Sequence, residues 1–466
     1  MKDTIAAIAT AASDSGIGII RVSGKESINK INDIFISKGK KHVLTDVKSH
    51  TIKYGFILDE KGETIDEVLV SVFHGPKSFT AEDTVEINCH GGLFVLRKIL
   101  ERVLSTGVRL AAPGEFTKRA FLNGRIDLSE AEAVMDLINS KNDYSLKASL
   151  NQLSGKLYDH VTKLREAVLH EVAFIESALD DPEHFDLSGY PEKLKEKITL
   201  IRGELEKMIS SFDNGKIIRE GISTVIVGKP NAGKSSLLNI LVGSERAIVT
   251  DIAGTTRDII EETINLNGIC LNVVDTAGIR ETDDKVERIG VDKAYEYAVK
   301  SDLIIYIVDS SVPLDESDEK IIEILKGKKT IVLLNKSDLD TKVDVDELKS
   351  KIRYVTDSDE NVSVIKTSTL DNTGIDEFEK CINDMFFAGH ISMNDEIVIT
   401  RERHKEALVN SYNDLSLVLE SIKKELPEDF YSIDLMNAYS NLGTIIGEEV
   451  EDDLVEKIFS EFCMGK

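Results

Sequence analysis

Residues 228–235 read Gly-Lys-Pro-Asn-Ala-Gly-Lys-Ser, which is the complete phosphate-binding pattern called a P-loop. A β-branched run at 222–227 precedes it and a helix-compatible run at 236–241 follows it, so the pattern has the strand–loop–helix context that it requires. Backbone N–H groups at the start of such a helix point toward a bound anion. We therefore predict a nucleoside triphosphate site in which Lys234 contacts the β- and γ-phosphates and the Ser235 hydroxyl binds Mg²⁺.

Two further motifs, each after a short apolar run, indicate which nucleotide is bound. Asp275-Thr276-Ala277-Gly278 follows 271–274, where an aspartate can hold the metal through water and a glycine N–H can reach the γ-phosphate. Asn335-Lys336-Ser337-Asp338 follows 330–334, and its last carboxylate suits the N1–H and 2-amino donors of guanine. Adenine lacks these donors and would leave the carboxylate unpaired, so the motif favours guanine.

The order of these motifs, with the polar segment 250–258 between them, resembles the GTPase superfamily. The predicted GTP-binding residues are Asn231, Ala232, Gly233, Lys234, Ser235, Ser236, Thr250, Asp251, Ile252, Ala253, Gly254, Thr255, Thr256, Asp275, Thr276, Ala277, Gly278, Asn335, Lys336, Ser337, Asp338, Ser368 and Thr369.

One position departs from Ras-like GTPases, in which a glutamine after the last glycine of the Asp-x-x-Gly motif orients the attacking water. This chain has Ile279 there, which can neither accept a proton nor place a water, so another group has to do so. Asn231 and the carbonyls of Thr250 and Ile252 offer oxygen ligands of the kind that a monovalent cation uses. Besides such a cation, the candidate groups are Arg257, Asp258, Arg280, Glu281, Glu287 and Arg288.

The whole chain limits the range of functions. Its 466 residues suggest about three domains. With 57 basic and 83 acidic residues it has a net charge of −26, which argues against a protein dominated by non-specific nucleic-acid binding but leaves room for a local basic patch. No apolar run approaches the ~18 residues of a membrane span, and the N-terminus has no signal-peptide form. Four scattered cysteines without metal-ligand spacing fit a reducing cytoplasm.

The pattern of apolar residues divides the chain into four segments. Residues 1–118 alternate strand-like runs at 17–22, 67–73 and 84–88 with a helix-like run at 93–104, which predicts an N-terminal α/β domain. Residues 119–219 carry a long amphipathic helical stripe at 157–179 and a further helix at 191–212. The nucleotide-binding motifs define a G domain at 220–382. Residues 383–466 return to helix, at 408–422, 433–446 and 454–462.

The two helical flanks each need an apolar partner, and they surround the G domain in sequence. We therefore predict a multidomain α/β plus all-α fold, in which both flanks form one discontinuous helical domain and the G domain is an insertion. The alternative is a pair of independent helical hairpins.

Several blocks outside the nucleotide motifs resemble one family, the bacterial tRNA-modification GTPases called MnmE or TrmE, within the TrmE-Era-EngA-like GTPases. The blocks are Asp3-Thr-Ile-Ala-Ala-Ile-Ala-Thr10 with Gly16-Ile-Gly-Ile-Ile-Arg21, Glu82-Asp-Thr-Val-Glu-Ile-Asn-Cys-His-Gly-Gly92, Pro113-Gly-Glu-Phe-Thr-Lys-Arg-Ala-Phe-Leu-Asn-Gly-Arg-Ile-Asp-Leu128 and Phe462-Cys-Met-Gly-Lys466. The resemblance covers essentially the whole chain. Departures include Phe79-Thr80-Ala81, where the family usually has Tyr-Thr-Gly, and Ser368-Thr369, where Ser-Ala is expected.

The resemblance implies an N-terminal folate-binding domain that also forms a homodimer. Members of the family act on tRNA with the FAD-binding partner MnmG, as a heterotetramer. They place an aminomethyl or carboxymethylaminomethyl group at C5 of the wobble uridine, U34, with the one-carbon unit coming from 5,10-methylene-tetrahydrofolate, of which 5-formyl-tetrahydrofolate is an analogue. Potassium and GTP together pair the two G domains and stimulate hydrolysis.

The resemblance also implies roles for individual residues. Potassium would be held by Asn231, Thr250, Ile252 and Thr255, and Mg²⁺ by Ser235 and Thr256. Glu287 would position the attacking water, in the place that Ile279 leaves vacant. Arg21, Glu86, Arg125 and Lys466 would contact folate.

Three interpretations stay open at this point. Cys463 is either a nucleophile for a one-carbon or uridine adduct or a small packing residue, because thiolate character and exposure are not visible in a sequence. His90 is interpreted as structural. The alternative function is that of a ribosome-assembly GTPase, a class that shares the Pro-Asn form of the P-loop but typically carries a basic RNA-binding domain.

Overall fold

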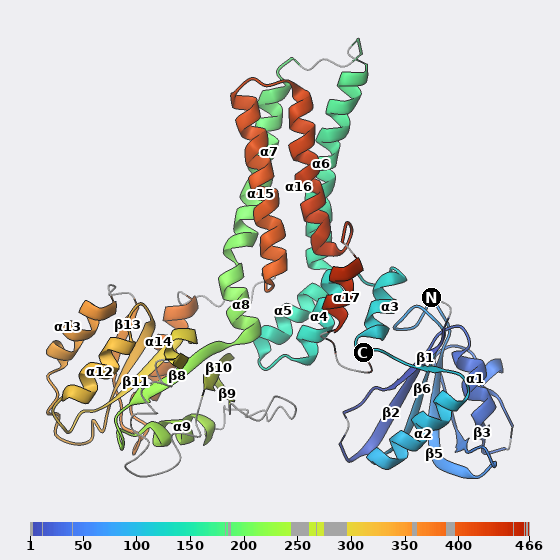
Figure 1. Cartoon of the computed structure of the whole chain (residues 1–466), viewed down its shortest axis with the longest axis horizontal. Coiled ribbons are helices and arrows are strands. Elements are labelled where there is room, and N and C mark those ends of the chain that lie inside the picture. The colour runs from blue at the N-terminus through green and yellow to red at the C-terminus, as the bar shows by residue number, and fades with distance from the viewer. Residues whose placement is uncertain are drawn as a thin grey trace. The chain divides into compact units, whose positions relative to one another are not determined.

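The computed structural model describes residues 3–11, 13–39, 41–181, 183–184, 188–243, 261–266, 268–274, 296–356, 361–387, 397–450, 452–460, 462 and 465. The chain forms two compact units. The first unit contains Met1–Met135, Gln152–Ile198 and Asn410–Lys466, and the second contains Asp136–Asn151 and Thr199–Val409. Figure 1 shows a sheet with helices at the N-terminus, long helices, and a second sheet with helices from the middle of the chain.

The first sheet has seven strands in the order β3-β4-β5-β6-β2-β1-β7, and only the β1–β7 pair is parallel. Its strands are β1 (Ile5–Ile8), β2 (Ser15–Ser23), β3 (Phe35–Ser37), β4 (Thr51–Leu58), β5 (Thr64–Phe73), β6 (Thr84–Gly91) and β7 (Arg109–Leu110). Its helices are α1 (Ser27–Ile34), the short 3-10 helix η1 (Leu44–Asp46), α2 (Leu93–Ser105) and α3 (Glu115–Leu122).

Alternation of side chains along the strands creates the core of this sheet. Val68, Val70 and Val72 of β5 are buried, as are Val85 and Ile87 of β6, whereas the residues between them are more exposed. This period of two places the valines on one face of the sheet, where α1 and α2 cover them. The strands predicted at 17–22, 67–73 and 84–88 and the helix predicted at 93–104 are confirmed as β2, β5, β6 and α2.

The helical part of the chain comes from both sides of the second sheet in sequence. Its helices are α4 (Leu128–Ile138), α5 (Asp143–Leu153), α6 (Lys156–Asp180), α7 (Tyr190–Ser210), α8 (Phe212–Glu220), α15 (Glu402–Lys423), α16 (Glu428–Ile446) and α17 (Asp452–Ser460). In the first unit, α6 packs along α16, and Leu128, Ala131 and Met135 of α4 pack against Val455 and Phe459 of α17. Contacts between the two flanks confirm one discontinuous helical domain and exclude two independent hairpins.

The helix predicted at 191–212 is confirmed as α7, which ends at Ser210, but the sequence did not predict the separate helix α8 that begins at Phe212. The Ser211 hydroxyl donates to the Met208 carbonyl oxygen at 2.7 Å and accepts the Ile399 N–H at 3.0 Å. Gly215 lies so close to Ile399 that a Cβ there would be 2.1 Å from the Ile399 carbonyl oxygen. The chain around 399 therefore crosses the helix at the break, which helical periodicity alone does not reveal.

The second sheet has six strands in the order β13-β12-β11-β8-β10-β9, parallel except for the edge strand β9. Its strands are β8 (Ile222–Gly228), β9 (Glu261–Leu266), β10 (Ile269–Val274), β11 (Leu303–Asp309), β12 (Lys329–Asn335) and β13 (Val362–Lys366), and its helices are α9 (Lys234–Gly243), α12 (Glu316–Ile324), α13 (Val345–Thr356) and α14 (Ile375–Phe387). Apolar cores lie on both faces. Since Phe386 and Phe387 belong to one of them, this structure extends past the predicted boundary at 382.

Residues 141–144, at the start of α5, are fastened to the β9–β10 hairpin within the second unit. Lys141 Nζ donates to Thr263 Oγ1 at 3.1 Å, and Asn142 Nδ2 lies 3.2 Å from Cys270 Sγ. Gly268, at the hairpin turn with φ of 91°, meets the Tyr144 ring so closely that a Cβ would be 2.5 Å from it.

In the described part of the chain, no helix combines the length and apolar composition needed to cross a bilayer.

Candidate functional site

The P-loop connects the end of β8 to the start of α9. Within it, Asn231 and Gly233 have φ values of 60° and 109°, which turn successive backbone groups toward the loop interior. Lys234 Nζ donates to the carbonyl oxygens of Gly228 and Lys229, each at 2.7 Å, so the amine lies across the mouth of the loop. Ser235 is exposed in the first turn of α9, where its hydroxyl is a suitable oxygen donor for Mg²⁺.

Lys229 fixes the outer side of the P-loop to α12. Its Nζ contacts Asp315 at 3.0 Å and Asp318 at 2.7 Å. The same two aspartates form the capping box that begins α12, and Asp318 Oδ1 also accepts the Tyr306 hydroxyl at 2.8 Å. Since Asp318 is almost fully buried, this network holds the loop in place from a helix about 85 residues later in the chain. Sequence reasoning did not find this role, because nothing local relates 229 to 318.

Asn335 joins the three predicted nucleotide segments for which the structure gives a position. Its Nδ2 donates to the Ala232 carbonyl oxygen of the P-loop at 2.8 Å, and its Oδ1 accepts the Thr369 N–H at 3.1 Å. The P-loop approaches so closely that a Cβ on Gly233 would lie 2.1 Å from Asn335 Nδ2. Glycine at 233 is therefore required both by its positive φ and by this approach.

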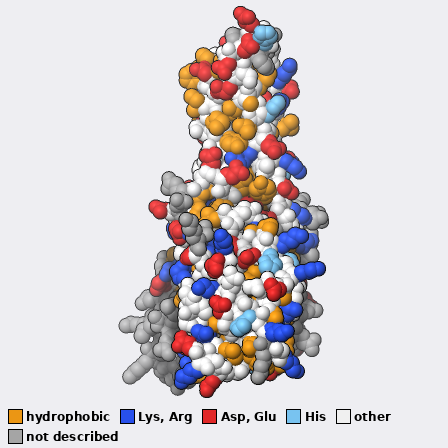
Figure 2. Space-filling model, turned by 90° about the vertical axis from the view of Figure 1, so that its right-hand side faces the viewer, with side chains coloured by type: hydrophobic (Ala, Val, Ile, Leu, Met, Phe, Trp, Pro, Cys, Tyr) orange, Lys and Arg blue, Asp and Glu red, His pale blue; other side chains and the backbone are white. Residues whose placement is uncertain are grey.

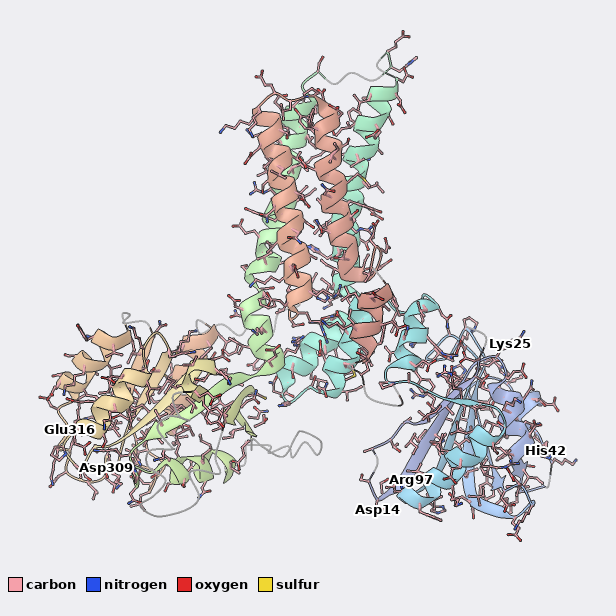
Figure 3. The ribbon with its side chains drawn as sticks, in the orientation of Figure 1. Asp14, Lys25, His42, Arg97, Asp309 and Glu316 are labelled. Carbon is pink, nitrogen blue, oxygen red and sulfur yellow. The ribbon has the colours of Figure 1, made fainter. Side chains whose placement is uncertain are left out.

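The base-recognition segment follows β12 directly. Lys336 has a φ of 62°, and its Nζ pairs with Asp309 Oδ2 of β11 at 2.6 Å. Burial of Asp309 opposes its ionisation, but hydrogen bonds from Lys336 and Ser311 outweigh this and hold its pKa below the usual value. Asp309 is labelled in Figure 3. Asp338 is exposed beyond the strand end, so its carboxylate can meet a base from solvent.

The loop at Ser368 and Thr369 is bound to the protein more fully than the sequence indicates. Ser368 is buried and donates its N–H to the Thr373 carbonyl oxygen at 3.1 Å. The Thr369 N–H is donated to Asn335 Oδ1 at 3.1 Å. The loop therefore lies beside the base-recognition segment, and its described N–H groups at these two positions are used within the protein.

Many predicted site residues lie outside the described residues. These are Thr250, Asp251, Ile252, Ala253, Gly254, Thr255, Thr256, Asp275, Thr276, Ala277, Gly278, Glu287, Cys463 and Lys466. Their predicted roles stay predictions. A described strand adjoins two of these segments. Strand β10 ends at Val274, immediately before Asp275, and strand β9 begins at Glu261, shortly after Thr256.

Burial controls the charge of the P-loop lysine. It lowers the pKa of Lys234 to about 8, because the amine is removed from water. Bound phosphates favour the charged amine and raise this pKa, so above pH 8 binding has to take up a proton.

We therefore expect GTP affinity to fall about tenfold between pH 7 and pH 9, as the free site loses its proton and the bound site keeps it. Titration of the protein with a fluorescent GTP analogue at these pH values measures the change. In a Lys234→Arg variant the pH dependence should disappear, whatever its affinity, because a guanidinium does not titrate in this range. A wild-type affinity that is constant over this range would contradict the assignment.

A second group of predicted residues meets on the N-terminal sheet. Arg21 of β2 and Glu86 of β6 are opposite each other in the strand register, and Arg21 Nε donates to Glu86 Oε1 at 2.9 Å. Arg21 Nη1 is also 3.5 Å from the Gly465 carbonyl oxygen, so the C-terminal motif reaches this pair. Two of the predicted folate contacts, Arg21 and Glu86, therefore lie in one region with Gly465, the neighbour of Lys466.

Phe79 connects Arg125 to this region. The Arg21 and Arg125 guanidinium carbons lie 5.4 Å and 5.2 Å from the centroid of the Phe79 ring, and Arg125 Nη1 donates to the Phe79 carbonyl oxygen at 3.0 Å. Arg21 is also 5.7 Å from the Phe116 ring centroid. Two cations and one carboxylate around an aromatic ring are groups that can interact with a flat, partly anionic ligand. The sequence identified the charged groups but missed the ring that orients them.

The surroundings of His90 and Cys89, two neighbouring residues of β6, limit their reactivity. His90 is held by Asp66, whose Oδ1 lies 2.7 Å from His90 Nδ1, and this hydrogen bond raises the pKa of His90. Cys89 is buried, and burial raises the pKa of its thiol to about 11, so it is not a reactive thiolate at neutral pH.

A parallel sheet whose first loop is a P-loop, joined through Asn335 to an Asn-Lys-x-Asp segment at the end of β12, defines a P-loop GTPase. Comparison with protein families identifies which one. Residues 128–463 match the MnmE helical domain, and residues 4–125 match the N-terminus of the GTP-binding protein TrmE. The chain belongs to the MnmE family of tRNA modification GTPases.

Curated relatives agree with this assignment over their full lengths. A protein of Lachnoclostridium phytofermentans named tRNA modification GTPase MnmE is 54% identical over 464 residues, which cover 100% of this chain and 99% of the relative. Proteins of the same name from Clostridioides difficile and Bacillus cytotoxicus are 48% and 47% identical over 466 residues, covering 100% of this chain and 100% and 99% of the relatives. This result favours the family over the ribosome-assembly alternative.

Proposed function

We propose that this chain hydrolyses GTP to GDP and phosphate as a step in the modification of tRNA. The observation that carries the proposal is the position of Asn335, which ties the P-loop to the base-recognition segment and so brings phosphate and guanine groups into one site. Lys234 would bind the β- and γ-phosphates, and Asp338 would accept the N1–H and 2-amino donors of guanine. In the reaction a water oxygen bonds to the γ-phosphorus, and the bond from that phosphorus to the bridging oxygen breaks.

We propose two metal ions at this site. The exposed Ser235 hydroxyl in the first turn of α9 suits Mg²⁺, and Thr256 would be the second protein ligand. The exposed Asn231 side chain suits potassium, and carbonyls of Thr250, Ile252 and Thr255 would complete its site. A bound potassium ion supplies positive charge of the kind that an arginine finger gives elsewhere. Glu287 would then hold the attacking water through a bridging water.

We expect the purified protein to hydrolyse GTP at least ~10-fold faster in potassium than in sodium at matched ionic strength, because the proposed potassium ion would stabilise the negative charge of the transition state. Asn231→Ala should remove the stimulation. Asn239→Ala is the control, since Asn239 is an exposed asparagine on α9, the helix that follows the P-loop. Equal, slow rates in both salts would instead indicate an external activator, and undiminished hydrolysis by Glu287→Ala would remove that residue from the mechanism.

We further propose that the region around Arg21, Glu86, Phe79 and Arg125 binds 5,10-methylene-tetrahydrofolate, with Lys466 completing it. The carboxylate of Glu86 suits the amino and amide donors of a pterin, and the guanidinium groups suit an anionic glutamate tail. When bound, the folate supplies the one-carbon unit. The residues of this chain bind and orient it, and Cys463 stays a candidate nucleophile.

Arg21→Ala is expected to weaken the binding of 5-formyl-tetrahydrofolate by roughly 10- to 100-fold, because a charge-assisted hydrogen bond is lost and Glu86 is left unpaired. Calorimetric titration of the full-length protein measures the effect. Arg97→Ala is the control, since Arg97 is an exposed arginine on α2 (Figure 3). Equal affinities of wild type and Arg21→Ala would exclude this region as the folate site.

The remaining parts of the proposal concern assembly and product. We propose that the chain acts as a homodimer with the FAD-binding partner MnmG, as a heterotetramer in the cytoplasm, and that together they modify C5 of the wobble uridine of certain tRNAs with an aminomethyl or carboxymethylaminomethyl group. Family membership supports this, since the relatives that match over their full length are named tRNA modification GTPases. Loss of the modification from tRNA after deletion of the gene would test it.

A further inference from the structure

One part of the N-terminal domain has a charge opposite to that of the chain. Residues 34–58 contain five lysines, at 38, 40, 41, 48 and 53, and two histidines, at 42 and 50, but only one acidic residue, Asp46. The segment therefore has a net charge of 5 − 1 = +4, in a chain whose net charge is −26. A local excess of this kind is the electrostatic footprint of a polyanion site, even where the whole protein is acidic.

The fold places this segment, which we call the basic edge, along one side of the N-terminal sheet. It runs from the end of α1 through β3, the outermost strand of the sheet, and η1 to β4. Lys38, Lys41 and Lys48 are exposed, and so are His42 and His50. Figure 3 labels His42 beside β3, and Figure 2 shows lysine, arginine and histidine side chains, with acidic ones between them, on the face of this domain that it presents.

The lysines of the basic edge are not neutralised by neighbouring carboxylates. Within the part of the chain that the structure describes, Lys38, Lys41 and Lys48 form no ion pair, whereas Lys197 pairs with Glu171 and Lys351 with Glu347. An unpaired lysine can neutralise a phosphate, and the cations that the nucleic acid then releases are a large source of affinity for phosphate backbones. The basic edge therefore has its charge available.

Aromatic rings stand among these cations. Lys38 Nζ lies 5.7 Å from the centroid of the Tyr54 ring, and the Tyr54 hydroxyl is held by Glu67 Oε1 at 2.5 Å. His50 packs edge-on against Phe73, with ring centroids 5.5 Å apart. Tyr54 is 38% exposed, so a fixed ring faces solvent beside a lysine. Cations interleaved with fixed, exposed rings suit RNA, because unpaired bases stack on rings while the backbone meets the cations.

We propose that the basic edge is a binding surface for the phosphate backbone of tRNA. This inference rests on the proposed function and adds to it that the acidic chain itself contacts the nucleic acid, at the edge of the sheet formed by β3 and β4. The negative charge of the remaining surface repels RNA elsewhere and so directs it to this edge. The contact is electrostatic and is strongest at low salt.

The test compares two triple variants of the full-length protein that lose the same charge. Lys38→Gln, Lys41→Gln and Lys48→Gln together remove exposed charge from the basic edge. Lys193→Gln, Lys216→Gln and Lys423→Gln together remove exposed lysines of α7, α8 and α15. The probe is an unmodified tRNA transcript with a wobble uridine, labelled at one end, and its fluorescence anisotropy is followed at several salt concentrations.

The basic-edge variant is expected to bind the transcript roughly tenfold more weakly at low salt, with the slope of log affinity against log salt smaller by ~2. The control variant should bind as the wild type does. GTP hydrolysis should be unchanged in both variants, which shows that they are folded. Equal weakening in both variants would mean a general charge effect and would overturn the proposal.

Two other outcomes would also overturn the inference, and they separate it from the proposed function. If the wild type does not bind the transcript but hydrolyses GTP with potassium stimulation, the basic edge is not an RNA site and the GTPase proposal stands. If the wild type binds phosphatidylglycerol vesicles through the same lysines and does not bind the transcript, the surface recognises lipid instead. Absence of GTP hydrolysis together with tight tRNA binding would leave this inference intact and remove the proposed function.

Discussion

Replacement of Lys234 by alanine is expected to lower kcat/KM for GTP by roughly 100- to 1,000-fold. Among the residues that the structure describes, this is the largest effect that we expect from a single change. Lys234 Nζ is 2.7 Å from two P-loop carbonyl oxygens and lies where the β- and γ-phosphates have to enter. Its charge is partly buried, and a charge in a site with little water interacts with phosphate far more strongly than a surface charge does. Alanine removes the charge and both hydrogen bonds.

A colorimetric phosphate assay together with binding of a fluorescent GTP analogue measures this effect. Lys320→Ala is the control, because Lys320 is an exposed lysine of the same domain, on α12. Thermal unfolding of the Lys234→Ala protein should resemble that of the wild type, since the freed carbonyl oxygens can accept water. A variant that is folded and still hydrolyses GTP at the wild-type rate would show that the triphosphate does not bind in this loop.

Asp338→Asn is expected to change the preferred nucleotide from GTP to xanthosine triphosphate, with a swing in relative kcat/KM of at least ~100-fold. The carboxylate of Asp338 accepts the N1–H and 2-amino donors of guanine, and an amide presents one acceptor and one donor instead. Xanthine has a carbonyl oxygen where guanine has the 2-amino group, so the amide pairs with xanthine and leaves the guanine amino group unmatched. Asp338 is exposed, so the change should leave stability nearly unaltered.

Hydrolysis of both nucleotides by wild type and variant, under the same salt conditions, measures the swing. Asp340→Asn is the control, since Asp340 is an exposed aspartate two residues further along the same loop. The control should keep the preference for GTP. If Asp338→Asn keeps it as well, the base is recognised by other groups, and the interpretation of the Asn-Lys-Ser-Asp segment is wrong.

Much of the fold was predictable because apolar periodicity is a local property. The valines of β5 and β6 alternate and the long stripe at 157–179 repeats at helical spacing, so β5, β6 and α6 appear in the structure where the pattern predicts them. The break between α7 and α8 was not predictable in this way. It depends on Ser211 and Gly215 meeting Ile399, and a residue about 190 positions away leaves no trace in local periodicity.

In the candidate sites, too, some groups could be predicted from local sequence and others could not. Charged and phosphate-binding groups were found from motifs, since their chemistry requires particular residue types at short spacing. The groups that hold them in place were not found. These are Asp318, which pairs with Lys229, Asp309, which pairs with Lys336, and the Phe79 ring, which contacts both Arg21 and Arg125. Of these, Asp309 had a usable signal, because it follows an apolar run of strand type and lies at the strand end where ligand sites of parallel sheets occur.

Local sequence was enough to predict a P-loop with a guanine-recognition segment and helices on both sides of it, because glycine, lysine and aspartate at fixed spacing and apolar residues at fixed period act through the local backbone. Which side chains meet depends instead on how the chain folds over long distances. Arg21 reaches Glu86, 65 residues away, through the register of β2 and β6, and a shift of β2 by one residue would turn Arg21 to the face opposite Glu86. The basic edge likewise became a surface only when β3 was placed at the outside of the sheet.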